Sequence, residues 1–418
     1  MSEGGTSNGV CLVEDEDMAL YKKDALNVVT FNYIYDLKTP NDVTFKPEMA
    51  HQIFGESESI FGYQSLSITL NYLHNSCKCY VDIKTSRKVK NNNIKADNIL
   101  DTLGKWLPTN FTVSPEVFSE WYSIEDHEKM YGNVLEKFQD QERMHRFGME
   151  NVLATYKITE NEIVDPSFKE FHSRFETFIV WFIDAASFID LDDDKWLIYY
   201  VYEEFEHPVS KKTIRSPIGF CTVYRFFAYP NGIRARISQF FILPSHQRRG
   251  IGTKLYQTVV KVLRSMDEVV DVTVEEPTLA FQKIRDLDDC LMVHKELQRL
   301  KKEFSMFRPK QLMELGRSLK IGRKQCERVY DVLGCCYMIE KGPSHHEKFL
   351  QEIKQRLTDE VKKDSKPGKR FCNKERLSLA LHMDRTPEVE MEFKKHLEDI
   401  EPSVKYLLKR LGKEAASD

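Results

Sequence analysis

The sequence predicts an α+β fold: a mixed, mostly antiparallel sheet flanked by helices, with an N-terminal α/β domain and a C-terminal helical domain. Two apolar segments, 218–227 and 233–243, are separated by Asn231-Gly232, which is typical of an antiparallel hairpin. A glycine-containing turn, an amphipathic helix and a short strand follow the second segment. After residue 290, apolar residues recur at helical spacing only.

The composition favours a globular protein of more than one domain and argues against a basic nucleic-acid-binding, disulfide-rich or membrane-spanning protein. A chain of 418 residues has room for roughly two or three domains, and its 26 Phe and 18 Tyr can build large cores. The net charge of −4 argues against a nucleic-acid-binding protein whose whole surface is basic. The nine cysteines include no paired Cys-x-x-Cys sets, so we expect neither disulfides nor a metal. No apolar run reaches membrane-spanning length, so we expect no membrane association.

The N-terminal part divides into a disordered tail, residues 1–20, and an α/β domain, residues 21–145. Segments 65–72 and 79–83 alternate apolar and polar residues, which predicts two half-buried strands that pair. Segments 96–106 and 125–140 are predicted to be helices. The polar stretch 141–148 is predicted to link this domain to the next.

The second domain, residues 146–290, has the clearest patterning. One helix face is formed by Phe171, Phe175, Phe178, Ile179 and Phe182. The run 196–202 is apolar and rich in β-forming residues, and the predicted hairpin follows it. Next come a helix over 248–264 and a strand over 269–274, which Pro277 ends.

Residues 291–418 are predicted to form the C-terminal helical domain. Phe349, Ile353, Leu357 and Val361 step by four, and a second stripe begins at Thr386-Pro387. Lys366-Pro367-Gly368 separates the two. Such stripes are more often core or helix-pair seams than functional grooves.

The turn from Gln247 to Gly252 is the strongest functional signal, because it joins a strand to a helix through two glycines. The first amides of a helix have no internal partner, and the helix dipole adds positive potential there. A phosphate group would gain roughly 0.3–1 kcal/mol from that dipole. The alternative is an ordinary tight turn, since neither a P-loop nor a dinucleotide-binding pattern is complete.

Two acidic positions are candidates for proton transfer. Glu275 and Glu276 close the strand 269–274, in which Val270, Val272 and Val274 share the predicted core face. Regular pleating would point Glu275 to a cleft and bury Glu276, whereas the turn at Pro277 would instead swing Glu276 outward. Asp184 is a lone acid in an apolar run, which predicts either a buried, hydrogen-bonded acid or a site residue.

The glycine turn resembles motif A of the GCN5-related N-acetyltransferases, Gln/Arg-x-x-Gly-x-Gly/Ala, whose loop amides hold the pyrophosphate of acetyl-CoA. Longer stretches are similar to the catalytic subunits of the type B histone acetyltransferases, over about residues 26–333. They are Trp181–Asp190, Gly219–Tyr224, Arg236–Leu243, Glu275–Pro277, His51–Gly55 and Phe61–Tyr63.

The resemblance implies an acetyltransferase sheet and an acyltransferase that uses acetyl-CoA as cosubstrate, without a metal. The acceptors would be lysines in the N-terminal tail of newly made histone four, which is accompanied by histone three. A WD-repeat histone-binding chaperone would be a partner, and the enzyme would work in the nucleus and cytoplasm.

The resemblance also implies roles for residues. Glu275 would be the general base, with Glu276 and Asp184 as supporting acids, since a carboxylate beside the amine can accept its proton. Phe240, Phe241 and Ile242 would contact acetyl-CoA through the strand backbone. Its pyrophosphate would be held by Gln247, Arg248, Arg249, Gly250, Ile251, Gly252 and Thr253. The tail would run between two groups, Glu56, Ser57 and Glu58 on one side and Tyr224, Arg225 and Phe226 on the other.

The chain departs from the family pattern at four of these positions. The family usually has Glu at position 184 and Asp at 276, and its acidic cluster at 56–58 is interrupted here by Ser57. Arg225 adds a positive charge to the predicted tail groove.

Other functions stay open from the sequence. One is a histone carrier with weak or no catalysis, and another is an acetyltransferase for a small amine. A third is DNA binding, because segment 312–333 has the outline of a helix-turn-helix with five basic residues: Arg317, Lys320, Arg323, Lys324 and Arg328. A helical hairpin with a solvated face explains that segment better, so we do not expect direct DNA binding.

Overall fold

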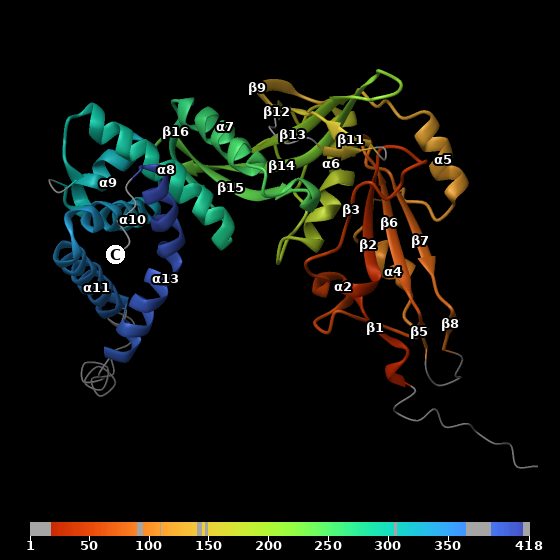
Figure 1. Cartoon of the computed structure of the whole chain (residues 1–418), viewed down its shortest axis with the longest axis horizontal. Coiled ribbons are helices and arrows are strands. Elements are labelled where there is room, and N and C mark those ends of the chain that lie inside the picture. Colours follow the sequence, from red (N-terminus) through yellow and green to blue (C-terminus); the bar gives the residue numbers. More distant parts are fainter. Residues whose placement is uncertain are drawn as a thin grey trace, which may run out of the picture. The chain divides into compact units, whose positions relative to one another are not determined.

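The computed structural model describes residues 18–89, 95–108, 110–139, 144–146, 149–304, 307–364 and 386–412. The fold is α+β, as predicted, with helices throughout the C-terminal region (Figure 1). The chain forms two compact units. The first comprises Met1–Tyr224 and Ser238–Thr258, and the second comprises Arg225–Ile237 and Val259–Asp418. Residues 1–17 of the predicted tail lie outside the described residues.

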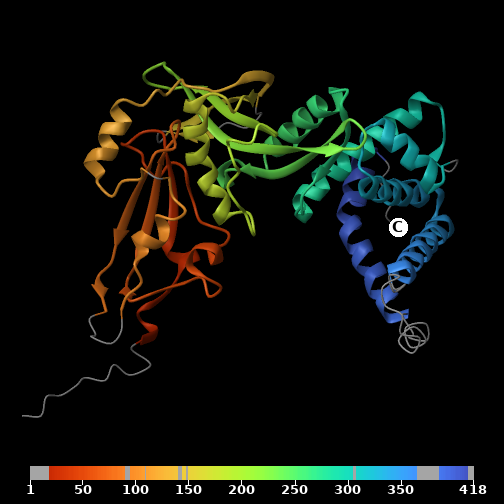
Figure 2. The ribbon, with the colours of Figure 1, turned by 180° about the vertical axis from the view of Figure 1, so that it is seen from behind.

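A four-stranded sheet forms the core of the N-terminal part, in the order β3-β2-β6-β7 (Figure 1). Figure 2 shows the same strands, in red and orange, from behind. The predicted strand pair is confirmed: β6 and β7 are antiparallel neighbours. The bounds are Val29–Ile34 (β2), Thr44–Phe45 (β3), Ser67–Leu73 (β6) and Cys79–Lys84 (β7). Two-stranded pairs flank them, Lys22–Asp24 (β1) with Ser59–Phe61 (β4) and Tyr63–Gln64 (β5) with Arg87–Lys88 (β8).

Short helices accompany this sheet: Ala25–Val28 (α2), His51–Phe54 (α3), Ile99–Leu103 (α4) and Pro115–Ser123 (α5). Helix α4 lies within the predicted 96–106. Helix α5 was not predicted, although its start carries a recognisable signal. Ser114 caps it by accepting a hydrogen bond from the amide of Val117, and Pro115 occupies the first turn.

The helix predicted over 125–140 is wrong. Asn133–Gln139 is instead strand β9, which pairs antiparallel with Thr155–Asn161 (β12). Phe138 packs its ring on Tyr156, at 5.2 Å between centroids, and Glu136 accepts a hydrogen bond from Thr258. Contacts between segments so far apart in the chain leave no signal in the local pattern, so tertiary pairing overrides a helix-like sequence.

The predicted link at 141–148 lies partly outside the described residues. Its described part, Met144–Arg146, is not a linker but strand β10, which pairs antiparallel with Met149–Val152 (β11).

The main sheet has six strands in the order β16-β15-β14-β13-β12-β9. It is mixed and mostly antiparallel, as predicted: β13 is antiparallel to both its neighbours, while β16 is parallel to β15. The predicted hairpin is confirmed as β14 and β15, which are adjacent strands. The bounds are Trp196–Glu206 (β13), Thr213–Ala228 (β14), Gly232–Ile242 (β15) and Val269–Val274 (β16).

Helix α6, Pro166–Phe175, begins at the cap Asp165, which accepts a hydrogen bond from the Ser167 amide. The predicted apolar face continues beyond it in a tighter 3₁₀ helix, η1, over Glu176–Trp181. Phe175 packs against Tyr200 and Phe220 of the sheet, and both Phe175 and Phe178 pack against Phe241. This aromatic core fixes the helices against the strand that ends in Phe240–Ile242.

The prediction that Val270 faces the core is wrong. Val270 is 41% exposed, whereas Val269 and Val272 are buried. Ile233 pairs with Val269, and the next residue, Arg234, pairs with Asp271, so the pairing skips Val270. An extra residue in one strand reverses the side-chain alternation, which periodicity alone cannot reveal.

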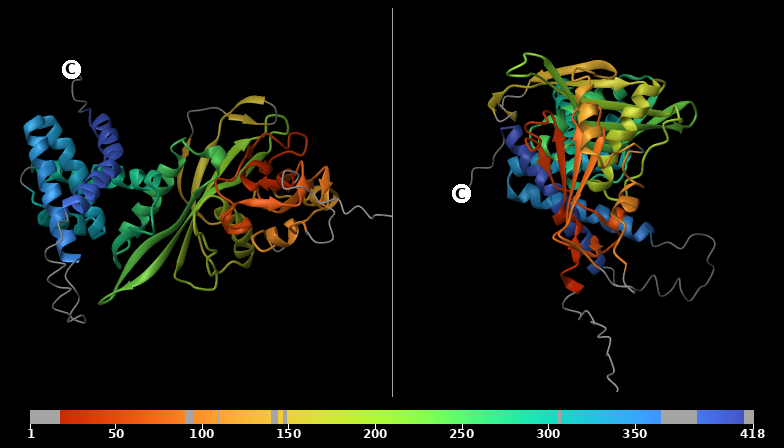
Figure 3. Two further views of the ribbon diagram at one scale, coloured as in Figure 1. Left: turned by 90° about the horizontal axis from the view of Figure 1, so that it is seen from below. Right: turned by 90° about the vertical axis from the view of Figure 1, so that its right-hand side faces the viewer.

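Figure 3 shows the C-terminal helices gathered together. They form their own core, in which Phe349 and Ile353 are buried, as their predicted stripe requires. The helix that carries the predicted second stripe begins at Thr386 among the described residues, in agreement with the sequence. Lys366-Pro367-Gly368 lies outside the described residues. The bounds are Leu279–Arg299 (α8), Pro309–Ser318 (α9), Arg323–Lys341 (α10), Pro343–Asp364 (α11) and Thr386–Arg410 (α13). No helix in the described part of the chain is long and apolar enough to cross a membrane.

Candidate active site

The glycine turn has the geometry that an anion-binding loop requires. A 3₁₀ turn, η2 at Pro244–His246, leads to Gly250, whose φ is +76°, and helix α7 begins at Ile251 and ends at Ser265. Only glycine adopts such a φ without strain, and a side chain built at Gly250 would meet no atom within 4 Å. At Gly250, therefore, no side chain obstructs the approach of an anion to the first amides of α7.

The end of β15 lies against the same turn. The Gln247 side chain donates a hydrogen bond to the carbonyl oxygen of Ile242 at 3.0 Å. A Cβ at Gly252 would lie 3.5 Å from the ring of Phe240 and 3.7 Å from the Ile242 side chain. Phe241 points the other way, into the aromatic core, and is 3% exposed. The structure thus brings the predicted coenzyme strand and the predicted coenzyme loop together.

The remaining residues of the loop differ in what they expose. Ile251 is 1% exposed, so it offers its backbone amide but not its side chain to a ligand. Gln247 and Arg248 are exposed, while Arg249 and Thr253 are half-buried. These features fit acetyl-CoA: amides and a half-buried arginine suit a diphosphate, and the open glycine admits it.

Three buried polar side chains, His246, Glu203 and Tyr35, form a hydrogen-bonded series beside the loop, and the sequence did not predict it. His246, the residue before Gln247, lies with its Nε2 3.1 Å from Oε1 of Glu203, and both side chains are fully buried. The other carboxylate oxygen accepts a hydrogen bond from the Tyr35 hydroxyl at 2.9 Å. Buried polar groups are costly unless they are hydrogen-bonded, and these contacts hold the turn before Gln247 against Glu203 of β13. Nothing in the local sequence links three residues so far apart.

Asp184 lies in the loop after η1, and the sequence left open whether it is a buried, hydrogen-bonded acid or a site residue. Its side chain is 78% exposed, and its Oδ1 lies 2.9 Å from Nε2 of His51. The apolar run around it continues the core helix only as far as Trp181, and the chain then turns outward. Of the two roles that the sequence left open, the structure removes that of a buried structural acid.

His51 joins Asp184 to the predicted tail-binding acids. Its Nδ1 lies 3.7 Å from Oε1 of Glu58, and that oxygen accepts hydrogen bonds from the amides of Ala50 and His51. Glu56 and Ser57 are exposed on the same turn. The structure therefore brings Asp184 and Glu58 together through a histidine that sequence analysis quoted only within a motif.

The loop that carries Asp184 is held from two sides. Gln52 of α3 donates to the carbonyl oxygen of Ala186 at 3.0 Å, and Gln239 of β15 donates to that of Ser187 at 2.7 Å. Gln239 directly precedes Phe240 in β15. The strand that is predicted to contact acetyl-CoA therefore also holds the loop that carries Asp184.

The predicted residues on β14 fall in both units. Tyr224, in the first unit, donates its hydroxyl to Asp193 at 2.8 Å and packs edge-on against Trp196. Arg225 and Phe226 belong to the second unit, where the Phe226 ring lies under the guanidinium of Arg236 at 4.7 Å.

Glu275 and Glu276 belong to the second unit and directly follow β16. Both are exposed, and the amide of Glu275 donates to the carbonyl oxygen of Ile237 at 2.9 Å. Glu276 has a φ of +34°, so regular pleating ends before it. Of the two alternatives at Glu276, the outward one is observed.

The described residues contain no group of three His, Cys, Asp or Glu side chains placed to hold a metal ion. The cysteines in the described ranges are free of disulfides and buried. In the segment compared with a helix-turn-helix, Lys320 donates to the carbonyl oxygen of Met266, and Arg328 is paired with Asp286. Arg323 is also paired with Glu327, at 3.2 Å. Three of its five basic side chains are thus engaged within the protein.

Comparison with known proteins gives two family matches. Residues 21–184 match the family described as histone acetyl transferase HAT1 N-terminus, and residues 164–281 match the acetyltransferase (GNAT) family. The histone acetyltransferase type B catalytic subunit of Mus musculus is 30% identical over 359 residues, covering 84% of this chain and 83% of that protein. The corresponding Homo sapiens protein is 29% identical over 357 residues, with the same coverage.

A solved structure, an aminoglycoside acetyltransferase from a soil metagenome in complex with sisomicin, is similar to part of the chain. It is 19% identical, with a TM-score of 0.22, and the match covers 31% of this chain and 83% of that one.

Proposed function

Because the chain belongs to the family of type B histone acetyltransferase catalytic subunits, we propose that it acetylates lysines in the N-terminal tail of newly synthesised histone four. It is an acetyl-CoA-dependent acyltransferase with histone acetyltransferase activity. The observation that carries the proposal is the assembled coenzyme loop: Gly250 with its positive φ, the start of α7 directly after it, and the strand end to which Gln247 is hydrogen-bonded.

The coenzyme would bind through backbone groups more than side chains. The amides of Ile251, Gly252 and Thr253 are the first of α7 and would donate to the diphosphate. Phe240 to Ile242 would contact the acyl end through the strand backbone. The thioester supplies an activated acyl group, so the protein needs neither a covalent intermediate nor a metal for this transfer.

The amine must lose a proton before it attacks. Deprotonating a lysine ammonium at pH 7 costs about 4–5 kcal/mol, because its pKa is near 10.4. In our proposal the Glu275 carboxylate accepts this proton, the amine nitrogen bonds to the thioester carbon, and the carbon–sulfur bond breaks to release the thiolate. Glu276 and Asp184 are supporting acids whose charge favours a cationic substrate.

The acidic cluster supports a basic tail as the substrate. Glu56, Glu58 and Asp184 place three carboxylates on adjoining turns of the first unit, and His51 connects two of them. Arg225 adds an opposing charge, which would restrict where the lysines of the tail can lie. We further propose histone three and a WD-repeat histone-binding chaperone as partners, and the nucleus and cytoplasm as the places of action, as family membership implies.

Kinetics on a histone four tail peptide test the base. Glu275→Gln is expected to lower kcat by roughly 10²–10⁴ at neutral pH, because it removes the general base, with acetyl-CoA binding retained. Glu276→Gln is the matched control and should cost far less. An unchanged rate in Glu275→Gln would refute the assignment of the base. A competition assay between the tail peptide and polyamines tests the substrate class, and preference for the polyamine would refute a histone substrate.

A further inference from the structure

The outer edge of β16 is covered by the turn between α9 and α10. The amide of Val272 donates to the carbonyl oxygen of Lys320 at 3.0 Å, and Val272 forms an isolated parallel bridge with Ile321. A Cβ at Gly322 would lie 3.3 Å from the Thr273 side chain, so the turn packs closely on the strand. An edge strand normally leaves such backbone groups unpaired.

Arg285 of α8 holds the other polar group of the same residue. Its Nη2 donates to the carbonyl oxygen of Val272 at 3.2 Å, and Arg285 is 8% exposed. Both backbone groups of Val272 are therefore bonded by the C-terminal helical region, the amide through Lys320 and the carbonyl through Arg285. Lys320 also donates from Nζ to the carbonyl oxygen of Met266, which lies between α7 and β16.

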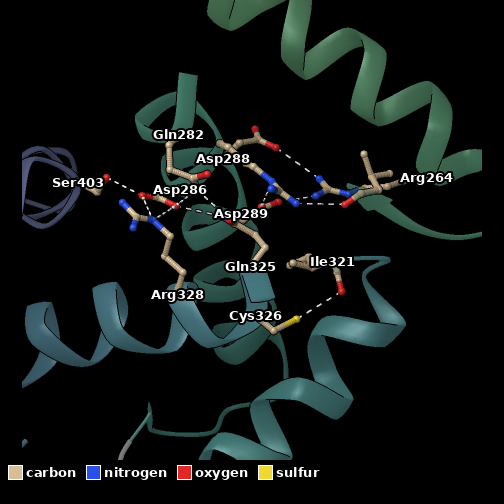
Figure 4. Close-up of polar contacts among 12 residues, drawn as sticks. Arg264, Gln282, Asp286, Asp288, Asp289, Ile321, Gln325, Cys326, Arg328 and Ser403 are labelled. Atoms are coloured by element: carbon tan, nitrogen blue, oxygen red, sulfur yellow. Dashed lines mark hydrogen bonds and ion pairs between the residues drawn. The ribbon is translucent and has the colours of Figure 1, made fainter. Parts of the chain in front are cut away.

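A buried ionic network keeps α8 in place (Figure 4). Asp289, one turn after Arg285, accepts a hydrogen bond from Arg264 near the end of α7. Asp286 is fully buried and accepts hydrogen bonds from Arg328 of α10 and Ser403 of α13. The helix that carries Arg285 is thus tied to three other helices, which makes it a rigid support.

We propose that Arg285 and the turn Leu319–Gly322 are positioning elements for Glu275. This inference rests on the proposed function, in which Glu275 is the general base. Glu275 follows β16 directly, so the placement of β16 sets the place of its carboxylate. The inner side of this segment is fixed to β15, for Glu275 by the hydrogen bond to Ile237. The outer side is fixed where Val272 meets Lys320 and Arg285 and where Gly322 packs against Thr273.

The chemical reason is the narrow tolerance of proton transfer to misplacement. A general base must come within about 2.6–3.2 Å of the group it deprotonates, and a misplacement of about 1 Å can cost about 100-fold in rate. A strand held on both sides preorganises the carboxylate, whereas a strand held on one side samples other positions. The C-terminal helices then contribute to kcat without touching the substrate.

The test is a double-mutant cycle in the full-length enzyme with a histone four tail peptide and acetyl-CoA. Arg285→Met is expected to lower kcat roughly 10- to 100-fold, with KM for acetyl-CoA changed less than about twofold. In the Glu275→Gln background, Arg285→Met should change the residual kcat less than about twofold, because no base is left to position. Arg285→Lys, which keeps a donor for Val272, should recover most of the rate. Arg299→Met is the matched control, since Arg299 is an exposed arginine on the same helix.

The outcomes separate the two proposals. If Glu275→Gln itself leaves kcat unchanged, the assignment of the base fails and this inference with it. If Glu275→Gln lowers kcat but Arg285→Met costs the same factor in both backgrounds, Arg285 is only structural and the positioning role is refuted. Should Arg285→Met fail to fold, Gly322→Val replaces it in the same cycle. Its added atoms would press on Thr273 and so disturb the packing of the turn on β16.

Discussion

His51 is the residue that organises the predicted acidic groups of the first unit. It contacts Asp184 at 2.9 Å and approaches Glu58 at 3.7 Å, although Asp184 is 133 residues away in the chain. The Asp184 side chain is exposed, and its contact with the imidazole restrains the position of the carboxylate. We therefore expect His51 to affect tail binding more than the chemical step.

His51→Ala is expected to raise KM for the histone four tail peptide roughly two- to fivefold, with kcat little changed. The expected effect is small because the Asp184 side chain that His51 contacts is 78% exposed, so the contact is weakened by solvent. Steady-state kinetics with varied peptide measure this effect. His345→Ala, at an exposed histidine of the second unit, is the control. A fall in kcat with KM unchanged would show instead that His51 acts on the reacting atoms.

Asp184 and Glu58 could be identified as candidate residues from the sequence, but the histidine contact between them could not. The apolar neighbours of Asp184 indicated burial, because the local sequence does not show that the core helix ends at Trp181 and that the chain then turns outward. His246 and Glu203 were missed for the same reason: a buried pair formed by residues 43 apart leaves no periodic signal. Residue types at a site could be predicted, whereas their partners required the fold.

At the scale of an element, the start of α7 should depend on its glycine. Gly250→Ala is expected to cost roughly 1–3 kcal/mol of unfolding free energy, because alanine at a φ of +76° is strained. It should also weaken acetyl-CoA binding, since the added carbon lies at the open start of the helix. Urea denaturation and calorimetric titration measure the two effects.

Gly342→Ala is the matched control for that substitution. Gly342 has a φ of +109° and no atom within 4 Å of a built Cβ, and it ends α10 in the second unit. The control should lose a similar unfolding free energy and keep full affinity for acetyl-CoA. Equal losses of affinity in both variants would mean that Gly250 acts only through stability.

Elements defined by strong periodicity were predictable, and those defined by pairing were not. Strands β6, β7, β14, β15 and β16 and the helices after residue 290 follow from alternation, helical spacing and the Asn231-Gly232 turn. Strand β9 was mistaken for a helix because its partner β12 supplies the contacts that make it a strand. The bulge at Val270 is likewise a property of the strand pair, since it appears only in the register with β15.

At the scale of the whole molecule, burial of ionisable groups sets the pH dependence of stability. Desolvation lowers the pKa of His74 and of His172 from 6.5 to about 3. The main cause is the same for Glu176, whose pKa burial raises from 4.5 to about 8. All three residues lie in the first unit, where burial among aromatic side chains favours the neutral form of an ionisable group over the charged form.

The sign for each group follows from which state binds more protons. Between pH 6.5 and 3 the unfolded chain binds protons at His74 and His172 that the folded chain does not, so stability falls as the pH falls. Between pH 4.5 and 8 the folded chain keeps a proton on Glu176 that the unfolded chain has lost, so stability falls as the pH rises. Below pH 6.5 the two histidines outweigh the one glutamate, and above it the glutamate acts alone. These three groups therefore place the maximum of stability near pH 6.5.

Glu176→Gln isolates the alkaline side of this profile. The variant keeps a neutral side chain at every pH, so its unfolding free energy relative to the natural protein should rise with pH from about 4.5 and level off above about 8. The slope approaches about 1.4 kcal/mol per pH unit, the value for one proton. Urea denaturation of both proteins at intervals across that range measures the difference. A difference that stays constant with pH would mean that Glu176 is ionised in the folded protein and that the packing around His172 and Glu176 accommodates a charge.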